Sequence, residues 1–382
     1  MSNQEKSIFF LFINGPHHVY HLIGPALSFS SGEHDYKTVF VSGNPTNTDI
    51  IRENEKFNES ADFILIDLPL PFRYRFIKSY RAKQYPPVYT RFNKIISKLK
   101  NASAIISTSH ELPKYIEENN IRKPKLFYLY HGTGSRAYGF DHRLNDFDYI
   151  LAPGPYHRDR LIDENVCDEK KIKMVGQPKF ESIENKYTSK KNIFNNDNPI
   201  FYYNPHWEMS LSSYLLWRKV LIDFFKENKK YNLIFAPHPL VKHLANKKGY
   251  SVEKNSKISG NIIIDLDSRS LIDGTYNAIS DVYIGDVSSM VAEWINYSPR
   301  TCIFINAQKI DWEGNKNYDM WRYGTVIDNP NQLEKQLKKS LSNNPFYKEQ
   351  IEHQQNFIYQ SDRSASKLCS DYIFEKLEFG QK

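Results

Sequence analysis

Long apolar runs and cysteines are the two features that this 382-residue chain has least of. No apolar run approaches the roughly 20 residues that a membrane-spanning helix needs, and the mean hydropathy is -0.61. A protein embedded in a membrane is therefore excluded. The N-terminus combines mixed charge with one short apolar run, which is typical of a first strand and not of a signal peptide.

The three cysteines, Cys167, Cys302 and Cys369, are odd in number and far apart. Such spacing excludes a zinc knuckle and favours a reducing compartment over a disulfide framework. Zinc-finger spacings and the aromatic signature of RNA-binding domains are also missing, so nucleic acid is not expected as a partner.

Basic residues, in contrast, are in excess. Lys and Arg number 51 against 44 Asp and Glu, which gives a net charge of +7. A basic surface favours anionic partners such as the phosphates of a nucleotide or an anionic membrane face. The length exceeds what a single core usually supports, and 40% hydrophobic residues provide a sizeable core, so two domains are expected.

Short apolar runs alternate with longer amphipathic stretches along the chain, a pattern that predicts two doubly wound α/β domains with parallel sheets. The polar stretch 177–199 interrupts the series and is predicted to be a linker. The first domain then covers residues 1–176 and the second covers 200–345, followed by a helical segment, 346–382, that packs back on the first domain. Strands are predicted at residues 8–13, 38–41, 63–66, 104–106, 126–130, 149–151, 200–203, 233–236, 262–264, 282–284 and 302–305.

Doubly wound sheets bind ligands beyond the carboxyl ends of their strands, so the two domains are expected to face a common cleft. The stretch ISDVYIGDVSSMVAEW predicts a buried strand, a turn and a short helix. Gly285, Asp286, Ser288 and Ser289 form the turn. Because a helix start exposes free N–H groups and partial positive charge, this turn suits a phosphate. An ordinary helix cap is the alternative. Glu293 could reach a ribose hydroxyl or lie in solvent.

Histidines follow several other strands. His131 ends the strand in LFYLYHGTGS, and its ordinary pKa near neutrality suits it to take a proton from a hydroxyl. The glycine turn Gly132, Thr133, Gly134 comes next, and Arg136 could assist with a phosphate. A buried structural histidine is the competing interpretation.

His238 lies between two prolines, which fix the backbone around it. A histidine held in this way can support the departure of a leaving group. Pro205 and His206 likewise follow a strand and present polar groups at its end.

Gly15 follows the first strand, and His17 and His21 come one helical turn apart. Contact with an acceptor substrate is expected here, and plain helix capping is the alternative. A zinc site is disfavoured because no third ligand is evident and no Glu stands between the histidines.

The order of these motifs is more specific than any one of them. His-Gly-Thr after a strand, Tyr-x-x-Pro, Pro-His-Pro, and then Asp-x-Ser-Ser-x-x-x-Glu resemble the CDP-glycerol glycerophosphotransferase family of teichoic-acid and capsule polymerases, over residues 126–305. The resemblance implies a GT-B architecture of two Rossmann-like domains, with the acceptor on the first and the nucleotide donor on the second. It also implies transfer of a polyol phosphate from CDP-glycerol, or a relative, to a hydroxyl of a polysaccharide or lipid-linked acceptor, with release of CMP and without a cofactor or metal.

Carried over to this chain, the resemblance makes His131 the histidine that activates the acceptor hydroxyl and His238 the one near the pyrophosphate. Ser288 and Ser289 would bind phosphate, and Asp286 and Glu293 match acidic positions of the motif. The family's Pro-Thr-Trp-Arg is replaced by Pro-His-Trp-Glu at residues 205–208, which leaves room for another donor. A peripheral location on the inner face of a bacterial cell membrane is also expected.

Two alternatives stay open. One is a GT-B glycosyltransferase or epimerase that uses a nucleotide sugar. The other is a non-catalytic component of a polysaccharide assembly complex, against which the presence of both His131 and His238 argues.

Overall fold

The computed structural model describes residues 6–56, 60–68, 92, 94–121, 124–132, 134, 137–187, 193–238, 240–242, 253–288 and 290–379. The chain divides into two compact units. The first unit comprises residues 1–181 and 356–382, and the second unit comprises residues 182–355. Helix α8 (Lys179–Tyr187) begins within the stretch that was predicted to be a linker.

A seven-stranded sheet with the order β3-β2-β1-β4-β5-β6-β7 forms the centre of the first unit. All its neighbouring strands pair in parallel. Their apolar side chains are buried because helices cover the sheet, as expected for parallel strands. The strands are β1 (Ser7–Phe12), β2 (Lys37–Ser42), β3 (Ile64–Asp67), β4 (Ala104–Ser107), β5 (Lys125–Leu129), β6 (Tyr149–Ala152) and β7 (Ile172–Met174).

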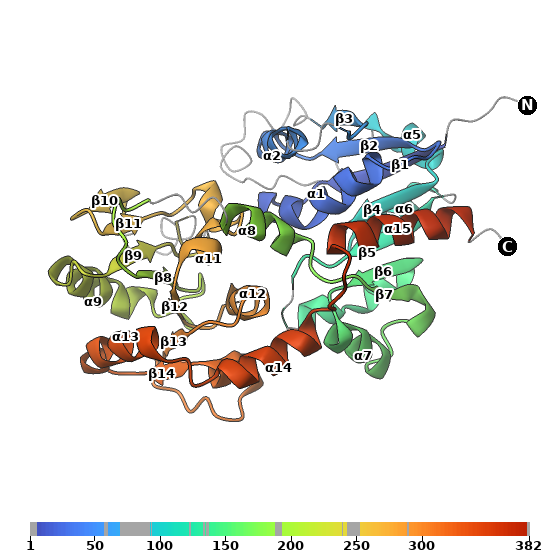
Figure 1. The fold of residues 1–382 in the computed structure, drawn as a ribbon. Coiled ribbons are helices and arrows are strands. Elements are labelled where there is room, and N and C mark those ends of the chain that lie inside the picture. The colour runs from blue at the N-terminus through green and yellow to red at the C-terminus, as the bar shows by residue number, and fades with distance from the viewer. Residues whose placement is uncertain are drawn as a thin grey trace, which may run out of the picture. The chain divides into compact units, whose positions relative to one another are not determined.

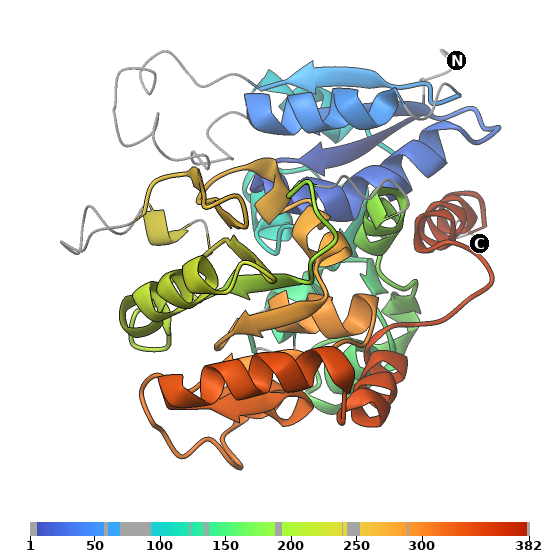
Figure 2. The same cartoon turned by 60° about the vertical axis from the view of Figure 1, so that its left-hand side comes forward.

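Helix α1 (Pro16–Ser30) follows β1 and packs on β1 and β2. Proline at its first position suits a helix start, because the missing N–H would have no helical partner there. The final helix, α15 (Ala365–Glu378), lies alongside α1, as Figures 1 and 2 show. The other α-helices described in this unit are α2 (Pro45–Glu55), α5 (Ile96–Lys100), α6 (Leu112–Glu118) and α7 (Pro155–Asp163).

The second unit holds another seven-stranded sheet, with the order β10-β11-β9-β8-β12-β13-β14. Its neighbours are parallel except for the edge pair β10 and β11, which is antiparallel. The strands are β8 (Ile200–Asn204), β9 (Asn232–Phe235), β10 (Ser256–Ile258), β11 (Ile262–Ile264), β12 (Val282–Gly285), β13 (Cys302–Ile305) and β14 (Thr325–Ile327).

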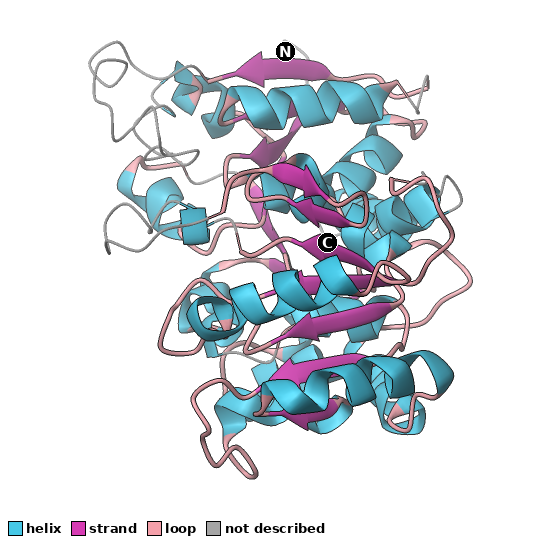
Figure 3. Ribbon diagram, turned by 90° about the vertical axis from the view of Figure 1, so that its left-hand side faces the viewer, coloured by secondary structure: helices cyan, strands magenta, loops and turns pink. Residues whose placement is uncertain are grey.

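Helices cover the strands of the second unit, drawn cyan over magenta in Figure 3. Helix α9 contacts β11, and α13 contacts β13. Helix α14 donates a hydrogen bond from Gln350 Nε2 to the carbonyl of Tyr323, at 2.8 Å. The α-helices are α9 (Tyr214–Glu227), α11 (Thr275–Ile279), α12 (Met290–Tyr297), α13 (Leu333–Ser342) and α14 (Tyr347–Phe357).

The prediction of two α/β domains built on parallel sheets is confirmed. All the predicted strands are present, with small shifts at their ends. Three short strands were missed: β7, β10 and β14, each of three residues. The edge strand β10, which was not predicted, pairs antiparallel with β11.

Candidate functional site

Polar side chains gather at the carboxyl ends of three adjacent strands in the first unit. Strands β1, β4 and β5 are neighbours in the sheet, and they are followed by His18, Thr108 and His131 respectively. Parallel strands place these ends at one edge of the sheet, so residues far apart in the sequence meet there. The rings of His18 and His131 lie with their centroids 4.1 Å apart and their planes 31° apart.

His131 is held as a neutral imidazole. Burial and, to a smaller extent, the nearby His110 lower its pKa to about 4, although a hydrogen bond with the backbone of Thr108 acts in the opposite direction. Its Nδ1 lies 3.4 Å from the hydroxyl of Tyr128. A neutral imidazole has one nitrogen with a lone pair, which is the requirement for a general base.

His110 and Tyr128 form a buried pair behind His131. The Nε2 atom of His110 is hydrogen-bonded to the hydroxyl of Tyr128, which connects in turn to His131. Burial lowers the pKa of His110 to about 4. This pair therefore places two neutral hydrogen-bonding groups next to His131 without adding charge.

The residues predicted to bind the acceptor fall into different environments. Gly15 is the N-cap of α1, and the ring of His17 lies 4.3 Å from that of His18. His21 is buried and its Nδ1 is 3.0 Å from Gln177 Oε1. Gly132 has open space where a Cβ would stand.

Two predicted residues, Thr133 and Arg136, lie outside the described part of the chain. Among the described residues, no group of three or more His, Cys, Asp or Glu side chains is placed to hold a metal ion.

A second set of polar groups lies at the carboxyl ends of β9, β8 and β12, which are adjacent in the second unit. The rings of His206 and His238 have centroids 6.4 Å apart. Nδ1 of His206 accepts the N–H of Glu208 at 3.1 Å, and Nδ1 of His238 accepts the N–H of Leu240 at 3.2 Å. With Nδ1 engaged as an acceptor, a neutral ring carries its proton on Nε2, which makes that atom a donor.

Pro205 connects the backbone segments that carry these two histidines. Its carbonyl accepts the N–H of His238 at 3.1 Å. Asn204, at the end of β8, donates its side-chain amide to the carbonyl of Ala236 at 2.6 Å. These bonds tie the segment after β8 to the segment after β9, so the two histidine rings are presented from one rigid edge.

Asp286 is buried, and its carboxylate accepts hydrogen bonds from the loop of residues 206–213. One carboxylate oxygen accepts the N–H of His206 at 2.8 Å, and the other accepts the N–H and the hydroxyl of Ser213 at 2.7 and 2.8 Å. Burial raises the pKa of Asp286 to about 6, and the bonds from Ser213 and His206 oppose the rise. Both oxygens are thus committed to holding residues 206–213, and any effect of Asp286 on a donor acts through that loop.

The other residues of the predicted phosphate turn have structural partners as well. Ser288 Oγ accepts the N–H of Met290 at 3.2 Å, which makes it a cap of α12, and it lies 3.4 Å from Asn204 Oδ1. Ser289 lies outside the described residues. Glu293 is half-buried on α12.

Gly285, which was predicted to be part of the phosphate turn, is the last residue of β12 and is closely packed. A Cβ at this position would lie 2.5 Å from the hydroxyl of Tyr283, a fully buried residue. The glycine is therefore required by packing within the strand.

Replacing Ser288 by alanine separates capping from donor binding. Loss of the cap should cost about 1 kcal/mol of stability. If the hydroxyl also contacts a phosphate, donor affinity should fall at least tenfold, because a hydrogen bond to a charged group contributes about 1.5–3 kcal/mol. Titration calorimetry and melting curves measure the two effects. Ser364→Ala is the matched control, since Ser364 caps α15 in the first unit. A lower melting temperature with unchanged donor affinity leaves Ser288 as a cap.

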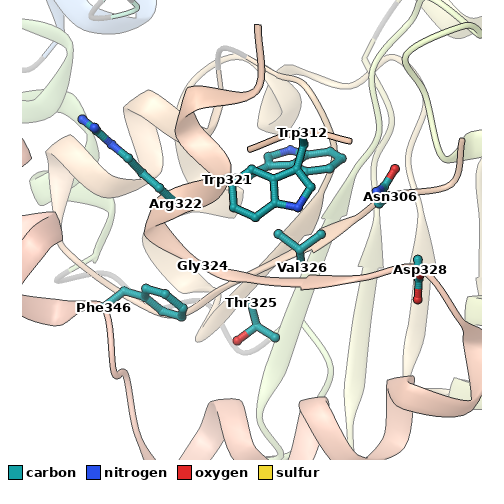
Figure 4. A pocket seen from close by; sticks show the side chains of 9 residues that line it. All are labelled: Asn306, Trp312, Trp321, Arg322, Gly324, Thr325, Val326, Asp328 and Phe346. Carbon is teal, nitrogen blue, oxygen red and sulfur yellow. The ribbon is translucent and has the colours of Figure 1, made fainter. Parts of the chain in front are cut away.

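A cavity of about 640 Å³ lies beside β14 in the second unit. The indole rings of Trp312 and Trp321 have centroids 5.9 Å apart, and Figure 4 shows them above Val326, with the guanidinium of Arg322 pointing away. None of the predicted site residues lines it. Its lining consists of Asn306, Trp312, Trp321, Arg322, Gly324, Thr325, Val326, Asp328 and Phe346.

Sequence reasoning missed five residues of the first unit's site: His18, Thr108, His110, Tyr128 and Asn14, whose side-chain amide donates to Thr108 Oγ1 at 3.3 Å. The signal was available for two of them. The segment Ser-Thr-Ser-His follows a predicted strand, and the rule that polar residues after strands meet at one edge points to Thr108 and His110.

Two parallel-sheet units with polar groups after their central strands define the GT-B type of two-domain α/β protein. Solved structures of similar fold agree. The wall teichoic acid polymerase TagF matches with a TM-score of 0.62 and 16% identity, over 100% of this chain and 91% of that one. The Staphylococcus aureus MnaA–UDP structure matches with a TM-score of 0.58 and 14% identity, over 98% and 96%. A putative UDP-N-acetylglucosamine 2-epimerase from Listeria monocytogenes gives 0.56 and 12%, over 99% and 98%.

The family follows from sequence. The chain belongs to the CDP-glycerol:poly(glycerophosphate) glycerophosphotransferase family, whose sequence model matches residues 75–375. The resemblance drawn from the order of the motifs is thereby confirmed. No match was found among curated proteins.

Proposed function

We propose that this protein transfers glycerol phosphate, or a related polyol phosphate, from a CDP-activated donor to a hydroxyl of a surface-polysaccharide acceptor and releases CMP. The family match over residues 75–375 is the observation that carries this proposal. The neutral His131 at the end of β5 supports it, because the reaction needs a base for the attacking hydroxyl.

The proposed reaction is a single displacement at phosphorus. His131 takes the proton of the acceptor hydroxyl, and the oxygen attacks the phosphorus atom next to glycerol. The bond between that phosphorus and the bridging oxygen breaks, and CMP leaves with the electron pair. Such transfers depend mainly on positioning and on stabilising the charge of the phosphoryl oxygens.

The second unit supplies groups for the leaving phosphate. His238 has its Nδ1 engaged by Leu240, so its Nε2 is a donor suited to the leaving oxygen. The start of α12, with Ser288, is proposed to bind the pyrophosphate, and His206 and Glu293 to contact the donor further along. Helix N–H groups and imidazole donors provide the stabilising field in this proposal, which therefore includes no cofactor.

A binding panel tests the choice of donor. Thermal shift and calorimetry with CDP-glycerol, CDP-ribitol, CMP and UDP-sugars should show the tightest binding for a CDP-polyol, because a ligand that binds the native state raises apparent stability. Tightest binding of a UDP-sugar would instead favour a nucleotide-sugar enzyme, consistent with the epimerase-like neighbours in fold.

Peripheral association with an anionic membrane is part of the proposal. The net charge of +7 supports it, and none of the helices in the described part of the chain has both the length and the apolar character of a membrane span. Binding to anionic vesicles in co-sedimentation should weaken as salt rises, since surface charges are screened over about 8 Å at physiological ionic strength. Equal binding to neutral and anionic vesicles would contradict the proposal that charge drives the association.

A further inference from the structure

His18 shares the site of His131, although no pattern in the sequence distinguished it from its neighbours His17 and His21. It comes from the first turn of α1, whereas His131 follows β5. The two rings are tilted by 31° to one another and their centroids are 4.1 Å apart. A substrate group that reaches one ring therefore meets the other.

The surroundings of His18 determine which of its nitrogens carries the proton. Thr108 Oγ1 lies 2.9 Å from His18 Nδ1, and the side-chain amide of Asn14 lies 3.4 Å from the same atom. That amide also donates to Thr108 Oγ1 at 3.3 Å. The side-chain nitrogen of Asn14 carries only donor hydrogens, so its approach to His18 Nδ1 requires that nitrogen to be the acceptor, which also fits a Thr108 hydroxyl that donates to Nδ1.

With Nδ1 accepting, a neutral His18 carries its proton on Nε2. Burial keeps the ring neutral, because it lowers the pKa of His18 well below its usual value, and the neighbouring His131 lowers it further. Two adjacent neutral imidazoles then present an acceptor for one hydroxyl proton and a donor for another oxygen.

We propose that His18 is a specificity-determining residue whose Nε2–H donates a hydrogen bond to the hydroxyl adjacent to the attacking one, so that the site selects an acceptor ending in a vicinal diol. The inference rests on the proposed function, since it requires an acceptor that ends in a polyol. Thr108 is its positioning residue, because its hydroxyl sets the proton position on His18.

Two synthetic acceptors test the proposal. One ends in glycerol phosphate, and the other ends in 1,3-propanediol phosphate, which keeps the primary hydroxyl and lacks only the vicinal one. With CDP-glycerol as donor, wild-type kcat/KM should be about tenfold lower for the propanediol acceptor, since a site built to bond a hydroxyl discriminates against an analogue without it.

Variants of His18 and Thr108 then test whether the His18 ring causes this difference in kcat/KM. His18→Ala should bring the ratio of the two kcat/KM values close to one, and Thr108→Val should reduce it partly. His18→Gln, which keeps an amide donor near the Nε2 position, should restore part of the ratio. His34→Ala is the matched control, because His34 bonds the carbonyl of Phe29 at the far end of α1, and it should leave the ratio at about tenfold.

One result would overturn the proposed function, and other results would overturn only the role of His18. Absence of transfer to the glycerol-ended acceptor by the wild-type protein would overturn the proposed function. Transfer with a wild-type ratio near one, or with a ratio unchanged in His18→Ala, would overturn the role of His18 while leaving the function in place.

Discussion

Replacing His131 by alanine should lower turnover by two or more orders of magnitude while donor affinity stays nearly unchanged. A positioned general base contributes about 10²–10⁴-fold, and a loss confined to the chemical step appears in kcat and kcat/KM together. The residue lies at the end of β5 among groups of the first unit, whereas the proposed donor-binding groups belong to the second unit. Turnover and calorimetric titration with CDP-glycerol on one preparation measure both quantities.

A pH profile provides the companion test. The pKa of His131 is lowered to about 4, so the base is unprotonated at every pH well above 4. The value of kcat/KM reports ionisations of the free enzyme. Titration of His131 should therefore leave kcat/KM unchanged from about pH 8 to pH 5 and lower it as the pH drops through about 4. Folding is checked by circular dichroism at each pH. A limb near the usual histidine value of about 6.5 that disappears in His131→Ala would contradict the neutral, buried base.

Replacing Asp286 by alanine should destabilise the second unit by roughly 3–5 kcal/mol. The change leaves the N–H of His206 and both donors of Ser213 without their acceptor, and each buried unsatisfied donor costs about 1–3 kcal/mol. Donor affinity should fall as well, because the loop that carries His206 is released. Urea unfolding and titration calorimetry give the two values.

Asp281→Ala is the matched control for that experiment. Asp281 precedes the same strand β12, is exposed, and accepts one bond, from the N–H of Ile200 at 2.8 Å. Its loss should cost less than about 1 kcal/mol and leave donor affinity unchanged. If Asp286→Ala proved as mild as this control, the carboxylate would not be the anchor of residues 206–213.

The predicted strands have three to six residues, and they were predictable because buried parallel strands are short apolar runs between polar segments. Strands β7, β10 and β14 were missed because they lie at the edges of their sheets and have few buried residues, so they do not form a buried apolar run. The antiparallel direction of β10 follows from the three-residue connection to β11, which is too short for the crossover that a parallel pair needs.

The candidate site was predictable to the level of strand ends but not of side-chain partners. His131, His206 and His238 were found because each follows a strand. His18 was not separated from His17, because the face that a residue presents depends on the residue at which α1 begins. A shift of one position rotates a side chain by about 100°.

The partners of Asp286 could not be predicted, because they come from elsewhere in the fold. Ser213 lies 73 residues from Asp286, a separation that no local pattern reveals. Gly285 packs against Tyr283, two positions earlier in the same strand, whose side chain occupies the space that a Cβ at residue 285 would need.

The nucleotide released during turnover tests the central claim most directly. Purified protein is incubated with CDP-glycerol and the glycerol-ended acceptor, and the products are separated by anion-exchange chromatography and identified by phosphorus NMR. Displacement at the phosphorus next to glycerol predicts CMP and a new phosphodiester in equal amounts, with both signals lost in His131→Ala. Release of CDP with no phosphodiester, or a phosphodiester formed at the wild-type rate by His131→Ala, would contradict the account.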